Sequence, residues 1–325
     1  MPTSSFVHVH LVALRYFGET VRSGSMRQAA EQLHVAASAV NRQILKLEDQ
    51  LQCKLFDRTA EGVRLTAAGE VLYHYILRFE HDLDRAISQI DDLRGLRRGH
   101  VRIACEDGIG RDFLPPVLAA FHGEFPRVTF SVEIASALDI LHQVAEGLTD
   151  IGISMTPPLN ADVSVQASAE MPIGVIAAPG SWIAARQSIR LREIGNEPII
   201  QAKDGTGGGT DFYAQLGNGL NHTRFIETNA PDFITNLVQA GLGVGFRTPV
   251  GILRDIEDGR IAFVSLRDDA AKSPVLAIYV KPQRTMPIAG AVLLERLRER
   301  LPAFRERVAA IGAVAPIAVP EPVPA

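Results

Sequence analysis

The sequence predicts a multidomain protein with a small, mainly helical N-terminal domain, one long connecting helix and an α/β C-terminal body. Three observations carry this prediction. Apolar residues recur at helical spacing through residues 11–51, and an apolar seam with a period near 3.5 runs through residues 72–93. From Val101 onward, strand and helix patterns alternate. A chain of 325 residues is long enough for two or three such domains.

Composition places the chain among ordinary globular proteins. Hydrophobic residues make up 46% and charged residues 22% of it, and no apolar run is long enough to cross a bilayer. The opening MPTSSFVHVH lacks the basic end and apolar core of a signal peptide. The two cysteines, Cys53 and Cys105, show no CxxC or metal-type spacing. We therefore expect a reduced, cytoplasmic protein with no membrane partner.

Charge is unevenly placed along the chain. The net charge is -4, but residues 1–66 carry eight Lys or Arg against six Asp or Glu. Residues 101–325 carry 20 Lys or Arg against 25 Asp or Glu. A mildly basic N-terminal domain on an acidic body is compatible with a protein in which only that domain contacts phosphate.

The N-terminal domain should contain three helices. The first covers residues 11–22 and ends at the stop signal Ser23-Gly24. Ser25 opens the second helix, where its hydroxyl and Gln28 form a capping box. His34, a residue type that tolerates left-handed backbone, sits in the turn before the third helix. The apolar stripes expected in the core are Leu11, Leu14, Phe17 and Val21 in the first helix, and Val40, Ile44, Leu47 and Leu51 in the third.

The third helix has a polar face, formed by Ser38, Asn41, Arg42 and Lys46. Two short helices joined by a tight turn, the second with a polar face, describe a helix-turn-helix, although an ordinary helical hairpin has the same spacing. Residues 54–66 read as two short strands around a turn at Glu61-Gly62, which would form a wing. Arg58 and Arg64 on this wing could contact phosphate or could be solvated surface charges.

These residues resemble the winged helix-turn-helix head of the LysR-type transcriptional regulators. The resemblance spans most of the first seventy residues, and its matching positions are Phe17, Gly24-Ser25, Ala29-Ala30, Leu33, Arg42-Gln43-Ile44, Leu47-Glu48, Leu55-Phe56, Arg58, Leu65-Thr66 and Ala68-Gly69. It implies a DNA-binding transcriptional regulator whose partner is double-stranded DNA. The residues that we expect to take part in DNA binding are Ser25, Arg27, Ala37, Ser38, Asn41, Arg42, Lys46, Arg58 and Arg64.

The chain departs from the family pattern at the start of the third helix. It has Ala36-Ala37-Ser38 where family members commonly have Ser-Gln-Pro, and Asn41 where they have Ser. Loss of the first serine weakens the helix N-cap by about 1 kcal/mol. The alanines can offer only a methyl group to thymine, whereas Asn41 suits adenine. We hypothesise that Asn41 and Arg42 read bases and that the wing arginines set the position on phosphate.

The connecting helix is predicted to start after a Thr66 cap and to run to about Leu96. Charged residues lie off its apolar seam, which favours a dimer coiled coil over a buried helix. The resemblance gives the same role, since the family dimerises through this helix; a homodimer is expected and a homotetramer is favoured. The basic cluster of residues 94–100 reads as a hinge. The seam residues are Leu72, Ile76, Phe79, Leu83, Ala86, Ile90 and Leu93.

The body alternates strands and helices, which predicts α/β subdomains around mostly parallel sheets. Its segments EGLTDIGIS and VQAGLGVGFRTP resemble the effector-binding domain of the same family. That resemblance implies a periplasmic-binding-protein-like fold with two lobes around a cleft. The expected boundaries are 8–66 for the DNA-binding domain, 67–97 for the linker helix, 98–311 for the effector-binding domain (lobe 1 at 98–163 and 268–311, lobe 2 at 164–267) and 312–325 for a Pro- and Ala-rich disordered tail.

A small-molecule effector would bind at strand ends that face the cleft. Each candidate has an alternative role, since apolar residues there often belong to a core and polar ones often cap helices. The pair Glu106-Asp107 stands where family members often have Ser or Thr, which favours a ligand with an amine or several hydroxyls over a simple anion. The candidates are Glu106, Ser136, Met155, Gln201, Thr228 and Phe246.

The leading interpretation is a regulator controlled by a small-molecule effector, with RNA polymerase as a possible partner at the nucleoid. The run at residues 204–212, DGTGGGTDF, lacks the ending of a P-loop, and we expect no cofactor, metal or catalytic residue. Three alternatives stay open: an enzyme with an accessory DNA-binding head, a transport-type binding protein, and a regulator that senses oxidants through Cys105 without a ligand. A buried apolar role for Cys105 competes with the last of these.

Overall fold

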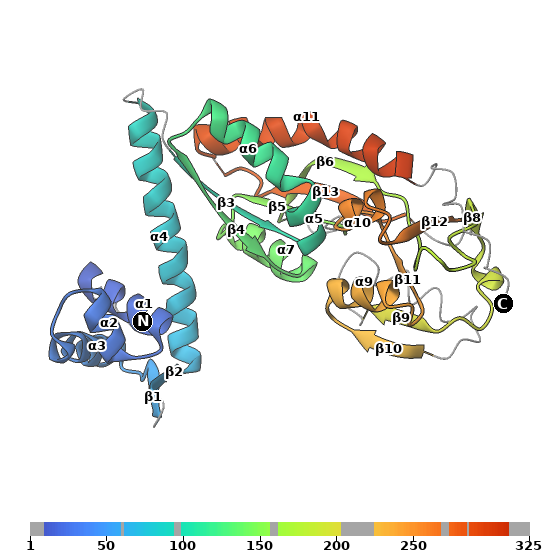
Figure 1. Cartoon of the computed structure of the whole chain (residues 1–325). Helices are drawn as coiled ribbons and strands as arrows, with labels where there is room; N and C mark the ends of the chain where they lie inside the picture. The colour runs from blue at the N-terminus through green and yellow to red at the C-terminus, as the bar shows by residue number, and fades with distance from the viewer. Residues whose placement is uncertain are drawn as a thin grey trace. The chain divides into compact units, whose positions relative to one another are not determined.

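The computed structural model describes residues 10–59, 62–93, 99–156, 162–202, 224–267, 273–284 and 286–311 (Figure 1). The chain forms two compact units, Met1–Ala86 and Ile87–Ala325. The expected tail at 312–325, residues 94–98 of the hinge expected at 94–100, and the glycine-rich run at 204–212 lie outside the described residues, whereas Gly99 and His100 of that hinge begin β3.

The first unit contains three helices, a two-stranded hairpin and most of the linker helix. The elements are α1 (Leu11–Ser23), α2 (Met26–Gln32), α3 (Ala37–Leu51), β1 (Phe56–Thr59), β2 (Gly62–Leu65) and α4 (Ala67–Leu93), whose last residues belong to the second unit. This order is the winged helix-turn-helix that the sequence predicts. Val40, Ile44 and Leu47 are buried in its core with Phe17.

One expected core residue of α1 is exposed. Leu11, the first residue of the helix, is 62% exposed, and the buried positions of α1 are instead Ala13, Phe17, Gly18 and Thr20. Leu11 occupies the first turn, whereas residues further along α1 pack against α2 and α3.

The helix ends and turns form at the residues that the sequence predicts. Gly24 ends α1 in the left-handed region with φ of 67°, and His34 adopts φ of 54° in the turn between α2 and α3. The Ser25 hydroxyl accepts a hydrogen bond from the N–H of Arg27, which is the serine half of the predicted capping box. The Thr66 hydroxyl accepts from the N–H of Gly69 and caps α4.

The predicted apolar seam of α4 has a half that packs into the core of its own domain and a half that is exposed. Ile76 is only 3% exposed because it packs into the core of its own DNA-binding domain, and Leu72 packs against the same core. Both residues are therefore corrected from the dimer seam to the intrachain core. In this half of α4 the outward apolar positions are Val71 and Tyr75, each 61% exposed. Further along, Phe79, Leu83 and Ile90 are exposed, and the side chain of Leu93 lies outside the described residues.

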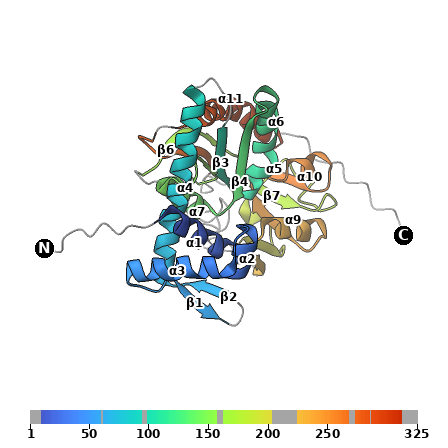
Figure 2. The ribbon, with the colours of Figure 1, turned by 90° about the vertical axis from the view of Figure 1, so that its left-hand side faces the viewer.

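The second unit is built on two sheets, and the first of them forms lobe 1. Its strand order is β4-β3-β5-β13-β6, and the bounds are β3 (Gly99–Cys105), β4 (Val128–Ile134), β5 (Ile151–Ser154), β6 (Ser164–Glu170) and β13 (Val275–Val280). The first three strands in this order are parallel, as predicted, whereas β13 is antiparallel to both of its neighbours. Helices α6 (Leu114–Glu124) and α11 (Ile288–Ile311) cover one face and α7 (Ala137–Glu146) covers the other (Figure 2).

The second sheet forms lobe 2, with the strand order β10-β9-β11-β7-β12-β8. Its strands mix parallel and antiparallel pairs. The bounds are β7 (Gly174–Ala177), β8 (Ser188–Ile189), β9 (Ile199–Ala202), β10 (Arg224–Thr228), β11 (Val244–Arg247) and β12 (Ala262–Leu266), with a 3-10 turn at Leu191–Glu193 and helices α9 (Pro231–Gln239) and α10 (Leu253–Glu257).

Lobe 1 begins with a short helix that the sequence pattern did not separate. The pattern of residues 112–125 predicts a helix after its prolines, whereas α6 already begins at Leu114 and a short helix, α5 (Asp107–Asp112), precedes it. The prolines at the start of α6 explain the break, because proline is favoured in a first helical turn and disrupts a continuous helix.

The segment around α10 joins the cores of the two lobes. Val250 and Leu253 are buried in the lobe 1 core, whereas Ile252 is buried in a lobe 2 cluster. The expected boundary assigned residues 164–267 wholly to lobe 2, but β6 (Ser164–Glu170) is a strand of the lobe 1 sheet and pairs with β13. The side chains show that α10 and the residues before it belong to both lobes.

Candidate functional site

The outer face of α3 carries the residues expected to read DNA. Ser38, Arg42 and Lys46 are exposed, together with Ala37, and Asn41 is partly buried and interacts within the chain. The N-cap residue Ala36 supplies no side-chain hydrogen bond to the helix. Backbone N–H groups at the start of α3 therefore have no side-chain cap, and a helix N-terminus of this kind can donate to a phosphate oxygen.

The wing is fixed to the turn between α1 and α2. The N–H of Val63 donates to the carbonyl oxygen of Gly24 at 3.1 Å. Gly62 has φ of +141°, and a methyl group there would lie 2.5 Å from the Gly24 oxygen, so a side chain would push the wing away. Arg64 is exposed on β2, and Arg58 lies in β1 opposite Val63 with a side chain outside the described residues.

A buried carboxylate ties the end of α3 to the start of the wing. Glu48 accepts from the N–H groups of Leu55 at 2.9 Å and Phe56 at 3.4 Å, and Lys54 Nζ lies 2.7 Å away. Burial alone would raise the pKa of the Glu48 carboxyl, but Lys54 and the two N–H groups more than offset it and lower the pKa. The ionised carboxylate therefore holds the recognition helix and wing in one arrangement.

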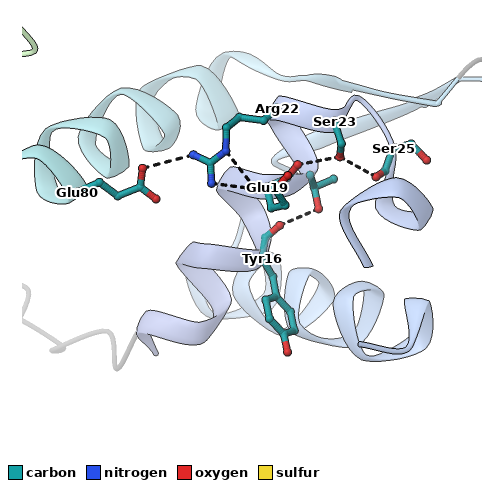
Figure 3. Close-up of polar contacts among 7 residues, drawn as sticks. Tyr16, Glu19, Arg22, Ser23, Ser25 and Glu80 are labelled. Atoms are coloured by element: carbon teal, nitrogen blue, oxygen red, sulfur yellow. Dashed lines mark hydrogen bonds and ion pairs between the residues drawn. The ribbon is translucent and has the colours of Figure 1, made fainter. Parts of the chain in front are cut away.

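Arg22 ties the helix-turn-helix to α4 (Figure 3). Its guanidinium forms ion pairs with Glu19 at 3.1 Å and with Glu80 of α4 at 3.4 Å. Next along the chain, the Ser23 hydroxyl donates to the Glu19 carbonyl oxygen, and it also lies 3.0 Å from the Ser25 carbonyl oxygen. Sequence reasoning missed Arg22 and Glu80 because they are 58 residues apart.

Two expected DNA contacts have other partners in the structure. Ser25 caps α2, so its hydroxyl is engaged with the backbone. Arg27 is 86% exposed and forms an ion pair with Glu31 at 3.3 Å, an i,i+4 pair that a phosphate could displace at little cost.

Four expected effector residues occupy the alternative roles stated above. Ser136 caps α7 by accepting from the N–H of Asp139, and Thr228 accepts from the N–H of Ala230 in the turn before α9. Met155 and Phe246 are buried in the hydrophobic cores of lobes 1 and 2. Helix capping by Ser136, a turn hydrogen bond to Thr228, and core packing account for these four side chains.

Glu106 differs from those four residues. Its side chain follows β3, is 7% exposed, and accepts from the N–H of Met155 through Oε2. The other oxygen, Oε1, is buried and has no hydrogen-bond partner in the described part of the chain. Burial raises the pKa of this carboxyl, and the Met155 N–H opposes that effect only in part. Gln201, on β9 of the other lobe, is also buried, at 9% exposure.

Charged side chains from α5 and α9 meet where the lobes face each other. Arg111 of α5 forms ion pairs with Asp107, on its own helix, and with Asp232 at the start of α9. Arg247 of β11 donates to the Pro231 carbonyl oxygen and to the Thr235 hydroxyl of α9. A polar junction therefore connects lobe 1 to lobe 2 through the Arg111–Asp232 ion pair. Arg247 instead holds α9 against β11 within lobe 2. Sequence reasoning named neither arginine.

The backbone of the two lobes also touches beside this junction. Asp112 accepts from the N–H groups of Gly251 at 2.6 Å and Leu253 at 3.2 Å. A methyl group at Gly251 would lie 2.6 Å from the Cα of Gly108, which is closer than real contacts allow. Burial raises the pKa of Asp112, although these N–H groups and two arginines oppose the effect.

The described residues contain neither a reactive cysteine environment at Cys105 nor a cluster of metal-binding side chains. Cys105 is fully buried, and burial together with Glu106 and Asp107 raises the pKa of its thiol to about 12. The thiolate, the reactive form, is therefore strongly disfavoured. Within the described ranges, no group of three or more His, Cys, Asp or Glu side chains could hold a metal ion.

Two family models match this chain. The model for the bacterial regulatory helix-turn-helix protein, lysR family, matches residues 11–70, and the model for the LysR substrate binding domain matches residues 94–302. The chain belongs to the LysR family. It is a DNA-binding transcriptional regulator with a ligand-binding domain, and its relatives are regulators rather than enzymes.

Curated relatives align with this LysR-family regulator over most of its length. It is 26% identical over 288 residues to the RuBisCO operon transcriptional regulator of Allochromatium vinosum, covering 88% of this chain and 94% of the relative. It is also 26% identical over 280 residues to the HTH-type transcriptional activator CmpR of Synechocystis, covering 85% of this chain and 91% of that protein.

Solved structures confirm the fold of this regulator. The crystal structure of the LysR family regulator CbnR superposes with a TM-score of 0.70 at 20% identity, covering 89% of this chain and 98% of CbnR. Full-length CbnR complexed with its target DNA gives a TM-score of 0.66 at 20% identity, covering 89% and 99% of the two chains. Among the helices of the described residues, none has the length and apolar character needed to cross a membrane.

Proposed function

We propose that this regulator binds a small-molecule effector between the two lobes of its C-terminal domain. The observation that carries the proposal is the polar junction between α5 and α9, where Arg111 of lobe 1 pairs with Asp232 of lobe 2. Both residues are only partly exposed, and the buried carboxyl of Glu106 lies in the residue directly before α5. A ligand that changed the contacts of α5 would change how the lobes are held together.

Glu106 and Gln201 are the proposed ligand contacts that remain from the sequence analysis. The unpartnered Oε1 of Glu106 can accept a hydrogen bond, and a protonated Glu106 can also donate one. This chemistry favours a ligand with an amine or several hydroxyl groups. The other four candidates would then support the site: Ser136 by capping α7, Thr228 by its turn hydrogen bond, and Met155 and Phe246 by core packing.

The DNA part of the proposal gives direct base reading to Asn41 and Arg42. Arg42 is exposed and has no ion-pair partner within the described residues. Asn41 already interacts within the chain, so a contact to a base would compete with that interaction. Ser38, Ala37 and Lys46 would flank these contacts on α3, and Ser25, Arg27, Arg58 and Arg64 would position the head on phosphate.

Assembly through the exposed apolar stripe of α4 completes the proposal. The stripe would pair with a second copy through Phe79, Leu83 and Ile90. Nearer the start of α4, the pairing residues would be Val71 and Tyr75 in place of the buried Leu72 and Ile76. The product is a homodimer that can pair into a homotetramer. Such a regulator would act in the cytoplasm at the nucleoid, where RNA polymerase is its natural partner.

A thermal-shift screen of the full-length protein against amines, polyols and carboxylates tests the effector proposal. A ligand at a hundred times its Kd adds about 2.7 kcal/mol of stability, enough for a shift of several degrees. We expect a saturable shift that Gln201→Ala or Glu106→Gln abolishes. The Ser136→Ala variant is the control, because removal of a helix cap lowers the melting temperature without abolishing the ligand shift. A shift that survives Glu106→Gln and Gln201→Ala would place the ligand elsewhere.

A further inference from the structure

A groove lies along the outer edge of the lobe 1 sheet, between β6 and α11. It has a volume of about 400 Å³ and includes Arg298, Leu301, Pro302 and Arg305 of α11. Its other wall is formed by residues 167–170 of β6. Figure 1 shows α11 lying alongside β6.

β6 is an edge strand within the described residues. It pairs with β13 on one side, and no described strand pairs with its other side. An open edge presents unpaired backbone N–H and C=O groups to any extended chain that reaches it. The groove thus offers backbone partners on one wall and two arginines on the other.

The chain that follows α11 carries a regular proline pattern, in the sequence IGAVAPIAVPEPVPA from Ile311 to Ala325. Its prolines are residues 316, 320, 322 and 324, all of them even-numbered. In an extended chain, alternate N–H groups point to the same side, and proline has no N–H. All four prolines therefore remove donors from one edge, while Ala315, Ile317, Val319, Glu321 and Val323 keep theirs on the other.

Such a segment can pair on one side only. Its odd-numbered edge can add to an open strand, and its even-numbered edge, poor in donors, then faces outward and discourages further pairing. Side chains alternate in the same way, so Ile317 and Val319 share a face with Glu321. That face combines apolar groups with the only charged residue among residues 312–325.

The length of the segment fits the groove, and the two arginines of the lining outnumber its one carboxylate, Glu170. Seven residues from Ala315 to Glu321 span about 20 Å when extended, and the groove face of α11 from Arg298 to Arg305 spans about 10 Å. Gly312 directly follows α11 and provides a residue that can reverse the chain. Glu321 has Arg298 and Arg305 as possible partners, and Arg298 otherwise pairs with Glu295 on its own helix.

We propose that residues 315–321 dock in the groove as an added strand on β6 of the same chain, with Glu321 beside the α11 arginines. The docked segment closes the open edge of the lobe 1 sheet against pairing with other chains. This role is independent of the effector site between the lobes.

Amide hydrogen exchange of the full-length protein tests the proposal at β6. Val319→Pro removes a donor from the pairing edge, and Ala318→Pro, the matched control, adds a proline to the edge that already lacks donors. We expect Val319→Pro to speed exchange across residues 164–170 by about tenfold or more, as truncation after Ile311 should, and Ala318→Pro to leave exchange unchanged. Peptides from β4, the opposite edge of the same sheet, serve as the internal reference.

Three results would overturn the proposal. The first is equal β6 exchange in the full chain and the chain truncated after Ile311. The second is an effect of Ala318→Pro as large as that of Val319→Pro, which would show that proline content rather than edge pairing matters. The third is protection of β6 that falls on dilution, which would assign the docked segment to a second copy.

Discussion

The guanidinium of Arg22 on α1 lies 3.4 Å from the carboxylate of Glu80 on α4 and 3.1 Å from that of Glu19 on its own helix. The first of these pairs connects the helix-turn-helix to the helix proposed to hold two copies together. The separation of two DNA-reading heads in a dimer depends on how each head is held against α4. The Arg22–Glu80 pair is therefore a contact through which half-site spacing can be tuned.

A double-mutant cycle with Arg22→Gln and Glu80→Gln measures this pair. Both side chains are about 40% exposed, so solvent screens the attraction, and we expect a coupling free energy of only about 0.5 kcal/mol. Amide exchange in α1 gives the local stability. The coupling should shrink in high salt. A coupling that is insensitive to salt would show that packing, not charge, joins the two helices.

Asn41→Ala should relax base preference more than it weakens binding to random DNA. Contacts to bases determine which DNA sequence is bound, whereas contacts to phosphates only position the protein on the duplex. Lys46→Ala is the contrasting variant, with similar losses on specific and random DNA and a shallower salt dependence. Fluorescence anisotropy with an operator fragment and a scrambled fragment checks both. Equal losses for Asn41→Ala on the two fragments would contradict direct reading by this residue.

Glu48→Gln should loosen the start of the wing. The pKa of Glu48 is lowered in the folded state, so its stabilisation is present above the ordinary value of about 4.3 and is lost as the pH falls. We expect the variant to lose about 1–3 kcal/mol of local stability at pH 7. Exchange of the Leu55 amide, followed from pH 7 down to well below about 4.3, measures this loss. The wild type should approach the variant at low pH, and parallel curves would rule out the carboxylate as the cause.

Glu106→Gln should have the opposite pH signature in the effector-binding domain. Burial raises the pKa of Glu106, so the folded state keeps a proton that the unfolded state releases, and stability falls as the pH rises from about 4.3 through the raised value. Glutamine is neutral throughout, so the variant should match or exceed the wild type in melting temperature at pH 8. The exposed Glu227→Gln provides the control. A lower melting temperature for Glu106→Gln at pH 8 would contradict a destabilising ionisation.

Gly251→Ala should strain the contact between the lobes. Gly251 has φ of +92°, and the added methyl group would meet the Cα of Gly108 at 2.6 Å. We expect a loss of about 2 kcal/mol or more in the unfolding free energy of the effector-binding domain. Gly259→Ala separates the two causes, because its φ is +69° with no atom within 4 Å of the new methyl group. Similar losses in both variants would mean that backbone strain alone explains the result.

Local patterns predicted most of the fold. The helix ends at Gly24, Ser25, His34 and Thr66 depend on residues within one turn, and the sequence names them directly. The seam of α4 was only half right, because a period of 3.5 identifies an apolar stripe but not its partner. Ile76 and Leu72 pack against the core of their own DNA-binding domain instead of a second copy.

The candidate effector site was harder to predict because it depends on contacts between distant segments. Arg111 and Asp232 are 121 residues apart, and nothing in either local sequence marks the pair. Ser136 and Thr228 stand at strand ends as ligand contacts do, but Ser136 caps α7 and Thr228 accepts a hydrogen bond in the turn before α9. Position after a strand therefore identifies the edge of the sheet and not the role of the side chain there.

The interleaved side chains around α10 also bear on protein engineering. Val250 and Leu253 complete the core of lobe 1, and Ile252 completes a cluster of lobe 2. A chimera made by exchanging residues 164–267 with those of a relative would import foreign side chains into a core that it was meant to preserve. Recombination of sensory lobes among LysR regulators should therefore treat α5, α6 and residues 250–253 as one exchangeable block.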